Sequence, residues 1–435
     1  MNFIEIHDVG YGECIVFEGK KNEILMVDCG SMNINIKNGD SSLKFKNYVT
    51  DFIVPRYKDA ENRSFLLTHF HKDHMCGFKY IIKKDKNYFN KIYIPYPSIN
   101  ADGKALLLEI AIYAFVFLKR QTACASMSTS ALFIFNFLSK NSGRASICPL
   151  KKGDSFEFSG IKYNVLNPNG DSFSFLEEFT SILARLDDIL LSSKESSIAN
   201  RFLNMKKTFC EEYVNCSNLC IKYNDLKNEY VKESIEKLNS YIINFNNLSF
   251  KLKQLDITSN IIEYLSSENI NMQYSMAQNS ASIVFHSDRS NMPTCNTIMM
   301  TGDATSEILD SLENELFESY NIIKVPHHGT DNYQSKAIDK INCSHMIISN
   351  GEYHAGGKIS KCFSENTAIK HCTGVRTCNY FKANASCCNR MIFCDSLKKD
   401  GALSSHCDKK AKSTGVNKCG IYIVSPSGDR GCYCD

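Results

Sequence analysis

A run of metal-binding side-chain types near the end of the first hundred residues constrains this chain more than any other feature. Residues 68–74 read Thr-His-Phe-His-Lys-Asp-His and follow directly on an apolar, strand-like run. Alternation along an extended segment would point His69 and His71 to the same side, and the turn after them carries Asp73 and His74. Imidazole and carboxylate groups so close together suit a divalent metal ion, although any one of these histidines alone could be a hydrogen-bonded surface residue.

Two later segments place further ligand types at expected strand ends. The apolar run Thr297 to Met300 is followed by Asp303, whose carboxylate could bridge two cations or, alternatively, cap the helix expected after it. A second pair of imidazoles, His327 and His328, directly follows another apolar run. Loops at the ends of neighbouring strands commonly build sites on a rigid scaffold. We therefore expect the three segments to meet at one point.

A bound divalent ion would explain why these side-chain types occur together. Such an ion lowers the pKa of its bound water from ~15.7 to about 7, so that hydroxide is available at neutral pH. Two ions about 3.5–4 Å apart can hold this hydroxide and also stabilise charge on the group under attack. The pattern therefore favours metal-dependent hydrolysis.

The chain alternates between strand-rich and helical stretches. Gly and Pro are absent from Phe173 to Met276, and apolar residues recur there at helical spacing, which predicts an insertion of two to four helices. Strand signals resume with Ala281 to Phe285. We therefore divide the chain into two halves of an α/β domain, a helical insertion and a cysteine-rich C-terminal segment packed on or appended to that domain. In the same order as the chain, the boundaries are 1–170, 171–276, 277–360 and 361–435.

The cysteines and the N-terminal sequence bear on the compartment. Eleven of the 20 cysteines lie between Cys343 and Cys434. The first residues lack the pattern of a signal peptide, so reduced thiols in a cytoplasmic protein are expected rather than disulfides. Without a clean pair of Cys-x-x-Cys knuckles, thiols filling small core sites are favoured over a structural zinc site in the tail. The most apolar stretch, Ala105 to Leu118, is short of the ~20 residues that span a bilayer.

The chain resembles the metallo-β-lactamase-fold hydrolases, whose signature is the His-x-His-x-Asp-His run found here at 69–74. Asp28, in Val-Asp-Cys-Gly, is similar to the acidic residue that supports the histidine loop of that superfamily without binding metal. Further segments resemble the hydrolase domain of the ComEC DNA-uptake protein and its soluble relatives, and they are Asp8 to Glu13, Asn279 to Val284, Thr301 to Asp303 and Lys324 to Gly329. The resemblance covers about residues 3–170 and 277–355. It implies an αββα sandwich carrying the helical insertion.

The resemblance also implies a two-metal centre that binds zinc or manganese. The implied ligands are His69, His71, Asp73, His74, Asp303 and one of His327 and His328. Of these, Asp303 would bridge the two ions, and the member of the last pair that binds no metal could serve as general acid. Many family members carry one more histidine before the bridging aspartate, where this chain has Asn279. Water, Asn279 or His286 could fill that position, so the resemblance leaves open whether one ion or two are bound.

Phosphodiester hydrolysis, by a nuclease or a phosphodiesterase acting on a nucleotide, is the leading functional prediction. Hydrolysis of a thioester, lactone or lactam at the same site is the first alternative, and a non-catalytic binding or signalling module is the second. The net charge of +3 permits an anionic substrate without demanding one. Lys72 and Lys324 could contact such a substrate, although an exposed loop lysine is usually just solvated. The insertion could cap the site, form a dimer, bind a protein partner or merely decorate the fold.

Overall fold

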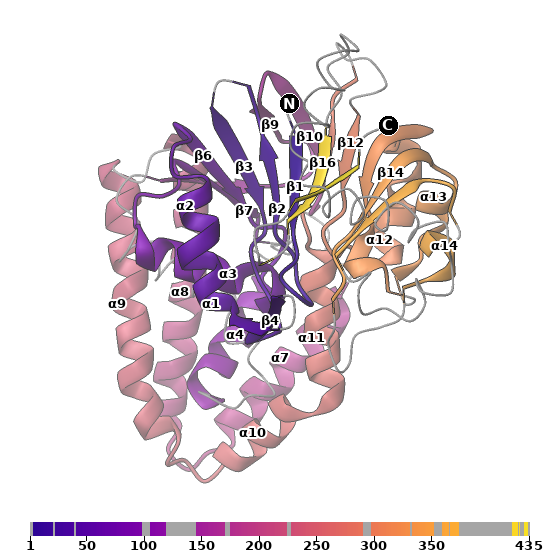
Figure 1. The fold of residues 1–435 in the computed structure, drawn as a ribbon. Helices are drawn as coiled ribbons and strands as arrows, with labels where there is room; N and C mark the ends of the chain where they lie inside the picture. The colour runs from indigo at the N-terminus through magenta and orange to yellow at the C-terminus, as the bar shows by residue number, and fades with distance from the viewer. Residues whose placement is uncertain are drawn as a thin grey trace.

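Two large mixed β-sheets form the centre of the protein (Figure 1). In this computed structural model the described residues are 3–20, 22–38, 41–97, 105–118, 145–169, 175–223, 228–289, 297–330, 333–351, 359–364, 366–373, 420–424, 426 and 430–433. The first sheet has the order β17 (Arg430–Tyr433), β16 (Gly420–Val424), β1 (Phe3–His7), β2 (Ile15–Glu18), β3 (Glu23–Val27), β6 (Asn62–Leu66), β7 (Lys91–Pro95) and β8 (Ser146–Leu150). The second has the order β15 (Ile369–Cys372), β14 (Asn342–Ile348), β13 (Ser319–Lys324), β12 (Ile298–Met300), β11 (Val284–Ser287), β10 (Ile161–Asn167) and β9 (Ser155–Phe158). A small hairpin joins β4 (Asn35–Asn38) to β5 (Ser41–Lys44).

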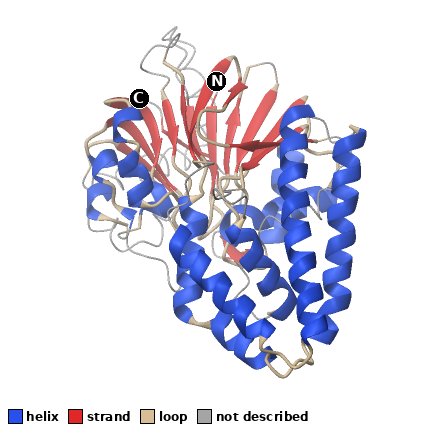
Figure 2. Ribbon diagram, turned by 180° about the vertical axis from the view of Figure 1, so that it is seen from behind, coloured by secondary structure: helices blue, strands red, loops and turns tan. Residues whose placement is uncertain are grey.

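Most residues of the central strands are apolar because both faces of each sheet are covered. In β3, Leu25 and Val27 lie in a core that is shared with residues of the second sheet, such as Phe285 and Met300. The alternate residues of β3 point the other way, into the core beneath the helices. The sheets therefore pack face to face, and Figure 2 shows helices on the outer sides of the strands.

The helices fall into two groups. Over the first sheet lie α1 (Phe45–Tyr48), the π-helical turn η1 (Val49–Ile53), α2 (Val54–Arg56), α3 (Lys72–Lys84) and α4 (Leu106–Phe117). Over the second lie α12 (Ser306–Ser311), the 3-10 turn η4 (Glu313–Glu315), α13 (Lys336–Asp339) and α14 (Lys361–Ser364). The helix expected directly after Asp303 is thus present, but it is short. The protein is a mixed α/β structure, as the sequence predicts.

The helical insertion connects β10 to β11, which pair directly with each other. It consists of α7 (Leu176–Leu191), α8 (Ser196–Tyr223), α9 (Glu229–Leu252), α10 (Thr258–Ser266) and α11 (Glu268–Ser280). The prediction of two to four helices was therefore too low by at least one. Helix boundaries here are set by Asn228 and Ser267, whose side chains cap α9 and α11, rather than by Gly or Pro, and an unbroken apolar period does not reveal such breaks.

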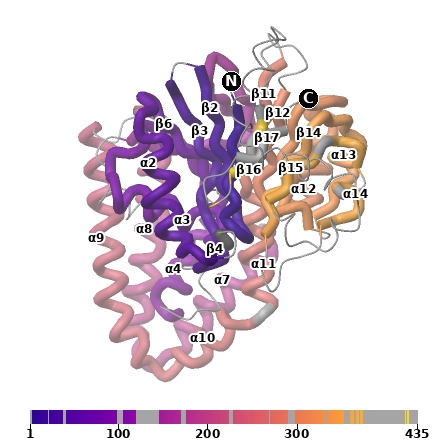
Figure 3. Tube along the Cα trace, viewed as in Figure 1, coloured from indigo at the N-terminus to yellow at the C-terminus, as the bar shows by residue number. Residues whose placement is uncertain are grey.

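The insertion is packed on the α/β domain rather than set apart from it. Its buried Lys206 forms ion pairs with Glu109 of α4, at 2.8 Å, and with Asp187 of α7, at 2.9 Å. Helix α11 then leads back to the sheets beside α7 (Figure 3). It runs through Asn279 and Ser280, so the strand expected from Ala281 begins only at Val284.

The C-terminal segment completes both sheets. Strand β15 pairs with β14, and β16 pairs in parallel with β1. The strand expected over Gly420 to Val424 is confirmed. The cysteines between 374 and 419 lie outside the described residues, and ten of the described cysteines are thiols that take no part in a disulfide. Within the described ranges, no helix has both the length and the apolar character needed to cross a membrane.

Glu5 of β1 anchors the helices over the first sheet through a buried ion pair. Arg56 donates two hydrogen bonds to it, at 2.6 and 2.7 Å, and the Tyr57 hydroxyl donates a third. Burial alone would raise the pKa of Glu5, but these hydrogen bonds and the nearby charge of His7 outweigh it, so the pKa is lowered. A lowered pKa means that the carboxylate stabilises the fold above its ordinary titration range and loses this contribution as the pH falls.

Glu5→Gln is therefore expected to lower the free energy of unfolding by about 1.5–3 kcal/mol at pH 7, the range for hydrogen bonds to a charged group. The deficit relative to the unmodified chain should shrink as the pH falls below about 4.5. Urea unfolding followed by far-UV circular dichroism at several pH values measures it. Glu61→Gln, at an exposed position, is the control. A deficit that is the same at all pH values would contradict the role given to the Glu5 charge.

Candidate metal centre

The three predicted segments meet where the two sheets adjoin. The histidine loop follows β6, and Asp28 follows β3, its parallel neighbour in the first sheet. Asp303 follows β12, and the pair His327 and His328 follows β13, its parallel neighbour in the second sheet. The carboxyl ends of neighbouring parallel strands lie at the same edge, so each sheet supplies one half of the site. The convergence expected from the sequence is what the geometry gives.

One carboxylate oxygen, Asp303 Oδ2, is the centre of the cluster. It lies 3.2 Å from His74 Nε2, 3.5 Å from His328 Nε2 and 3.8 Å from the Nε2 atoms of both His69 and His327. Asp303 is 1% exposed, and three of the four imidazoles are fully buried. The N-cap of α12 is Thr305, so capping is not the role of Asp303.

Asp28 orients the histidine loop from behind, as the resemblance implies. It accepts hydrogen bonds from the Thr68 amide, at 2.7 Å, and from the Thr68 hydroxyl, at 2.6 Å. Its second oxygen also faces His74 Nδ1 at 2.8 Å, which leaves His74 Nε2 directed at Asp303. An imidazole held in this way has a fixed tautomer and ring orientation.

The two histidines after β13 have different surroundings. His328 is fully buried, with Nδ1 2.7 Å from the Ser349 carbonyl and Nε2 3.2 Å from Asp73. The His327 side chain is 22% exposed, and its ring stacks on Tyr333 with centroids 3.7 Å apart. Both residues have positive φ, 44° and 58°, a backbone conformation that is uncommon for residues other than glycine. His328 is thus the member placed with Asp73.

Helix α11 fills the region where many family members carry one more metal-binding histidine. Ser275 lies 3.3 Å from His71 Nε2, and His71 Nδ1 lies 3.0 Å from His69 Nε2. Asn279 donates its amide to Tyr333 at 2.8 Å, while its buried Oδ1 has no hydrogen-bond partner among the described residues. His286, one of the candidates for that position, is engaged elsewhere. It is buried against Phe317 and hydrogen-bonded to Tyr320, because its strand is covered there by the loop before β13.

A buried ion pair lies behind the cluster, and the sequence did not identify it. Lys324 Nζ contacts Glu13 at 2.6 Å, the Gly302 carbonyl at 2.8 Å and Asp303 Oδ1 at 3.4 Å. All of these side chains are buried. From the sequence, Lys324 was expected to contact an anionic substrate or to extend into solvent. Its burial contradicts both expectations, because β13 is a central strand. The one available signal was a lysine at the end of an otherwise apolar run.

The charges of the cluster are interdependent. Burial would raise the pKa of Asp303, but His74, His328 and Lys324 hold it well below its usual range. Burial would lower the pKa of His74, yet Asp303 and Asp28 raise it well above normal. Without a metal ion, the carboxylates are thus neutralised by protons on imidazoles. A divalent cation would replace those protons, since metal binding to imidazole releases them.

The donor set fits a divalent ion. One compact group, Glu13, His74, Asp303 and His328, offers ligand atoms that all lie within 4.8 Å of one another, and every member is buried. Burial and the neighbouring imidazoles hold the pKa of His69 well below normal, so it is neutral and able to bind metal. Glu13 is already paired with Lys324 in this arrangement. Asp73, at 3.2 Å from His328, is therefore the better fourth ligand.

No protein-family model and no curated protein matches this chain.

Proposed function

We propose that this chain is a metallo-β-lactamase-fold hydrolase that binds two divalent ions, zinc or manganese, and hydrolyses a phosphodiester. The observation that carries the proposal is the set of four imidazole Nε2 atoms within 3.8 Å of one Asp303 oxygen. When bound, the ions would supply a nucleophile at neutral pH and stabilise negative charge on the phosphate.

The chain's own residues would divide between two positions. Asp73, His74 and His328 would hold one ion, and His69 with His71 would hold the other. Asp303 would contact both. The second position lacks the histidine that many family members carry. Asn279 stands at that place in the sequence, and its Oδ1, which has no hydrogen-bond partner among the described residues, would supply a neutral oxygen there. The ion pair of Lys324 with Glu13 would fix Asp303, because Lys324 holds one of its oxygens and leaves the other toward the imidazoles.

His327 would act on the substrate side of the cluster. It is the most exposed of the four imidazoles around Asp303, and burial lowers its pKa to about 4. It is therefore neutral at pH 7 and would donate a proton only after an anionic group beside it had raised that pKa. Positioning of the phosphate is thus its first role, and proton donation to the leaving group depends on substrate binding.

The proposal is tested by a panel of substrates and one ligand variant. We expect the chain, stripped with a chelator and reloaded with Mn²⁺ or Zn²⁺, to hydrolyse bis(p-nitrophenyl) phosphate but not acyl thioesters or lactones. Losing a group that only orients a ligand costs ~10–100-fold in metal affinity or activity, so Asp73→Ala should lower kcat/KM by more than about a hundredfold.

Asp85→Ala, exposed at the other end of α3, is the matched control and should leave kcat/KM unchanged. Hydrolysis of a thioester or lactone in place of the diester would overturn the substrate class and keep the metal mechanism. If Asp73→Ala left every activity unchanged, the metal mechanism itself would be wrong.

A further inference from the structure

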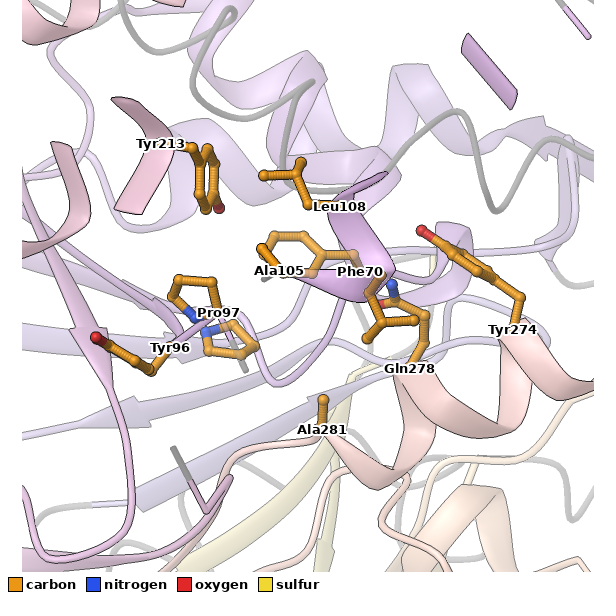
Figure 4. Close-up of a pocket in the computed structure, with 11 residues that line it drawn as sticks. Phe70, Tyr96, Pro97, Ala105, Leu108, Tyr213, Tyr274, Gln278 and Ala281 are labelled. Carbon is orange, nitrogen blue, oxygen red and sulfur yellow. The ribbon is translucent and has the colours of Figure 1, made fainter. Parts of the chain in front are cut away.

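An apolar pocket of about 480 Å³, including its open mouth, lies between the α/β domain and the insertion. Its walls come from the end of β7, from α4, from α8 and from α11 (Figure 4). Most of its lining is aromatic or aliphatic, and it includes Phe70, Tyr274, Ala281 and the polar Gln278. Its mostly apolar lining with few polar groups is that of sites that bind small molecules.

The pocket adjoins the metal centre through two shared segments. Phe70, in its wall, stands between His69 and His71 in the chain. On α11, Tyr274 precedes Ser275, whose hydroxyl lies 3.3 Å from His71 Nε2. The pocket wall therefore shares the histidine loop and helix α11 with the half of the cluster that contains His69 and His71.

Gln278 is a polar side chain in this mostly apolar lining, and its carboxamide bears on which ligands fit the pocket. The residue is only 4% exposed, and within the described part of the chain its carboxamide has no hydrogen-bond partner. Figure 4 shows this side chain directed from α11 toward Phe70. The amide borders the pocket and can reach its contents, so a ligand that offers both a donor and an acceptor would be preferred over an alkyl group, which would cover the amide without replacing its water.

We propose that this pocket holds the base of a nucleotide substrate, with Gln278 reading its hydrogen-bonding edge and the aromatic wall packing against its ring. The inference rests on the proposed phosphodiesterase function, because the base would lie here while the phosphate reaches the metal centre. A base offers both a planar apolar face and adjacent donors and acceptors, which is how proteins read an unstacked nucleotide. An acyl chain would fill the walls and leave Gln278 unsatisfied.

A binding experiment on the chelator-treated chain tests the pocket without any catalysis. Thymidine 5′-monophosphate and thymidine, titrated by calorimetry, should each bind saturably. Gln278→Leu should weaken both by about three- to tenfold, the range for one net hydrogen bond. Gln273→Leu, on the same helix but outside the pocket, should change neither. Ala281→Phe, which fills the pocket from its rim, should abolish binding and covers the case in which Gln278→Leu is misfolded.

A kinetic experiment links the pocket to the reaction. The p-nitrophenyl ester of thymidine 5′-monophosphate carries a base, whereas bis(p-nitrophenyl) phosphate does not. Gln278→Leu should lower kcat/KM three- to tenfold for the first ester and leave the second unchanged.

The two experiments separate the inference from the proposed function. Binding of thymidine with no hydrolysis of either ester would defeat the proposed function and leave the base site standing. Equal hydrolysis of both esters, without binding of thymidine, would overturn the base site alone. Saturable binding of a medium-chain fatty acid that Ala281→Phe abolishes, in place of thymidine, would also overturn it.

Discussion

Asp303→Asn is expected to reduce the divalent ions retained after dialysis from two per chain to at most one. The amide keeps the shape of the side chain but removes the charge that four imidazoles face. A metal ion supplies several kcal/mol of transition-state stabilisation, and each 1.36 kcal/mol is tenfold in rate. We therefore expect kcat for a phosphodiester to fall by more than about a thousandfold. Elemental analysis and steady-state kinetics on the same samples measure both effects.

The control for this variant is Asp288→Asn, at the end of β11 in the same sheet. That carboxylate forms a surface ion pair with Lys162, at 4.0 Å, and such pairs contribute little. Metal content and kcat should both stay unchanged. Full retention of two ions by Asp303→Asn, with an unchanged kcat, would remove the bridging carboxylate from the proposal.

The ligand residues around Asp303 could be predicted from the sequence because each of them lies in a local pattern that indicates it. The runs before Thr68, Asp303 and His327 are apolar and short, and the ligand types come directly after them. Parallel strands place such ends at one edge, so the convergence follows without knowledge of the loops. The helical insertion was equally local, since its composition changes abruptly near Phe173.

Contacts that depend on distant pairing could not be predicted. Nothing near His327 and His328 says which one is buried, because the answer depends on two positive φ angles and on the position of Ser349 in the next strand. The pocket behind Phe70 depends on how α8 and α11 pack, and periodicity does not specify that. Strand β16 likewise pairs with β1 from the far end of the chain, a choice that local pattern does not reveal.

The ion pair of Glu13 with Lys324 was missed for the same reason, and it leads to the largest expected effect on stability. Lys324→Met is expected to lower the free energy of unfolding by about 3–5 kcal/mol, the cost of removing one partner of a buried pair. Methionine fits the apolar path of the lysine stem, but Glu13 is left as a buried carboxylate without its cation. Because the chain has no tryptophan, urea unfolding is best followed by far-UV circular dichroism.

The pH dependence of this loss identifies its cause. Burial raises the pKa of Glu13 even with Lys324 beside it, and removing the lysine should raise it further. The folded variant then binds a proton more readily than the unfolded chain, so its deficit should be larger at pH 8 than at pH 5. Adding Glu13→Gln to Lys324→Met should recover most of the loss at pH 8, since the uncompensated charge is gone.

An exposed ion pair provides the matched control for the buried one. Lys152 pairs with Glu315 across the surface, and both side chains are 39% exposed. Lys152→Met should cost no more than about 1 kcal/mol, as is usual for exposed pairs. If Lys324→Met cost no more than Lys152→Met, Glu13 would be neutral in the native protein. The charge of Lys324 would then compensate Asp303 alone, and the region around the metal centre would hold one proton more than proposed.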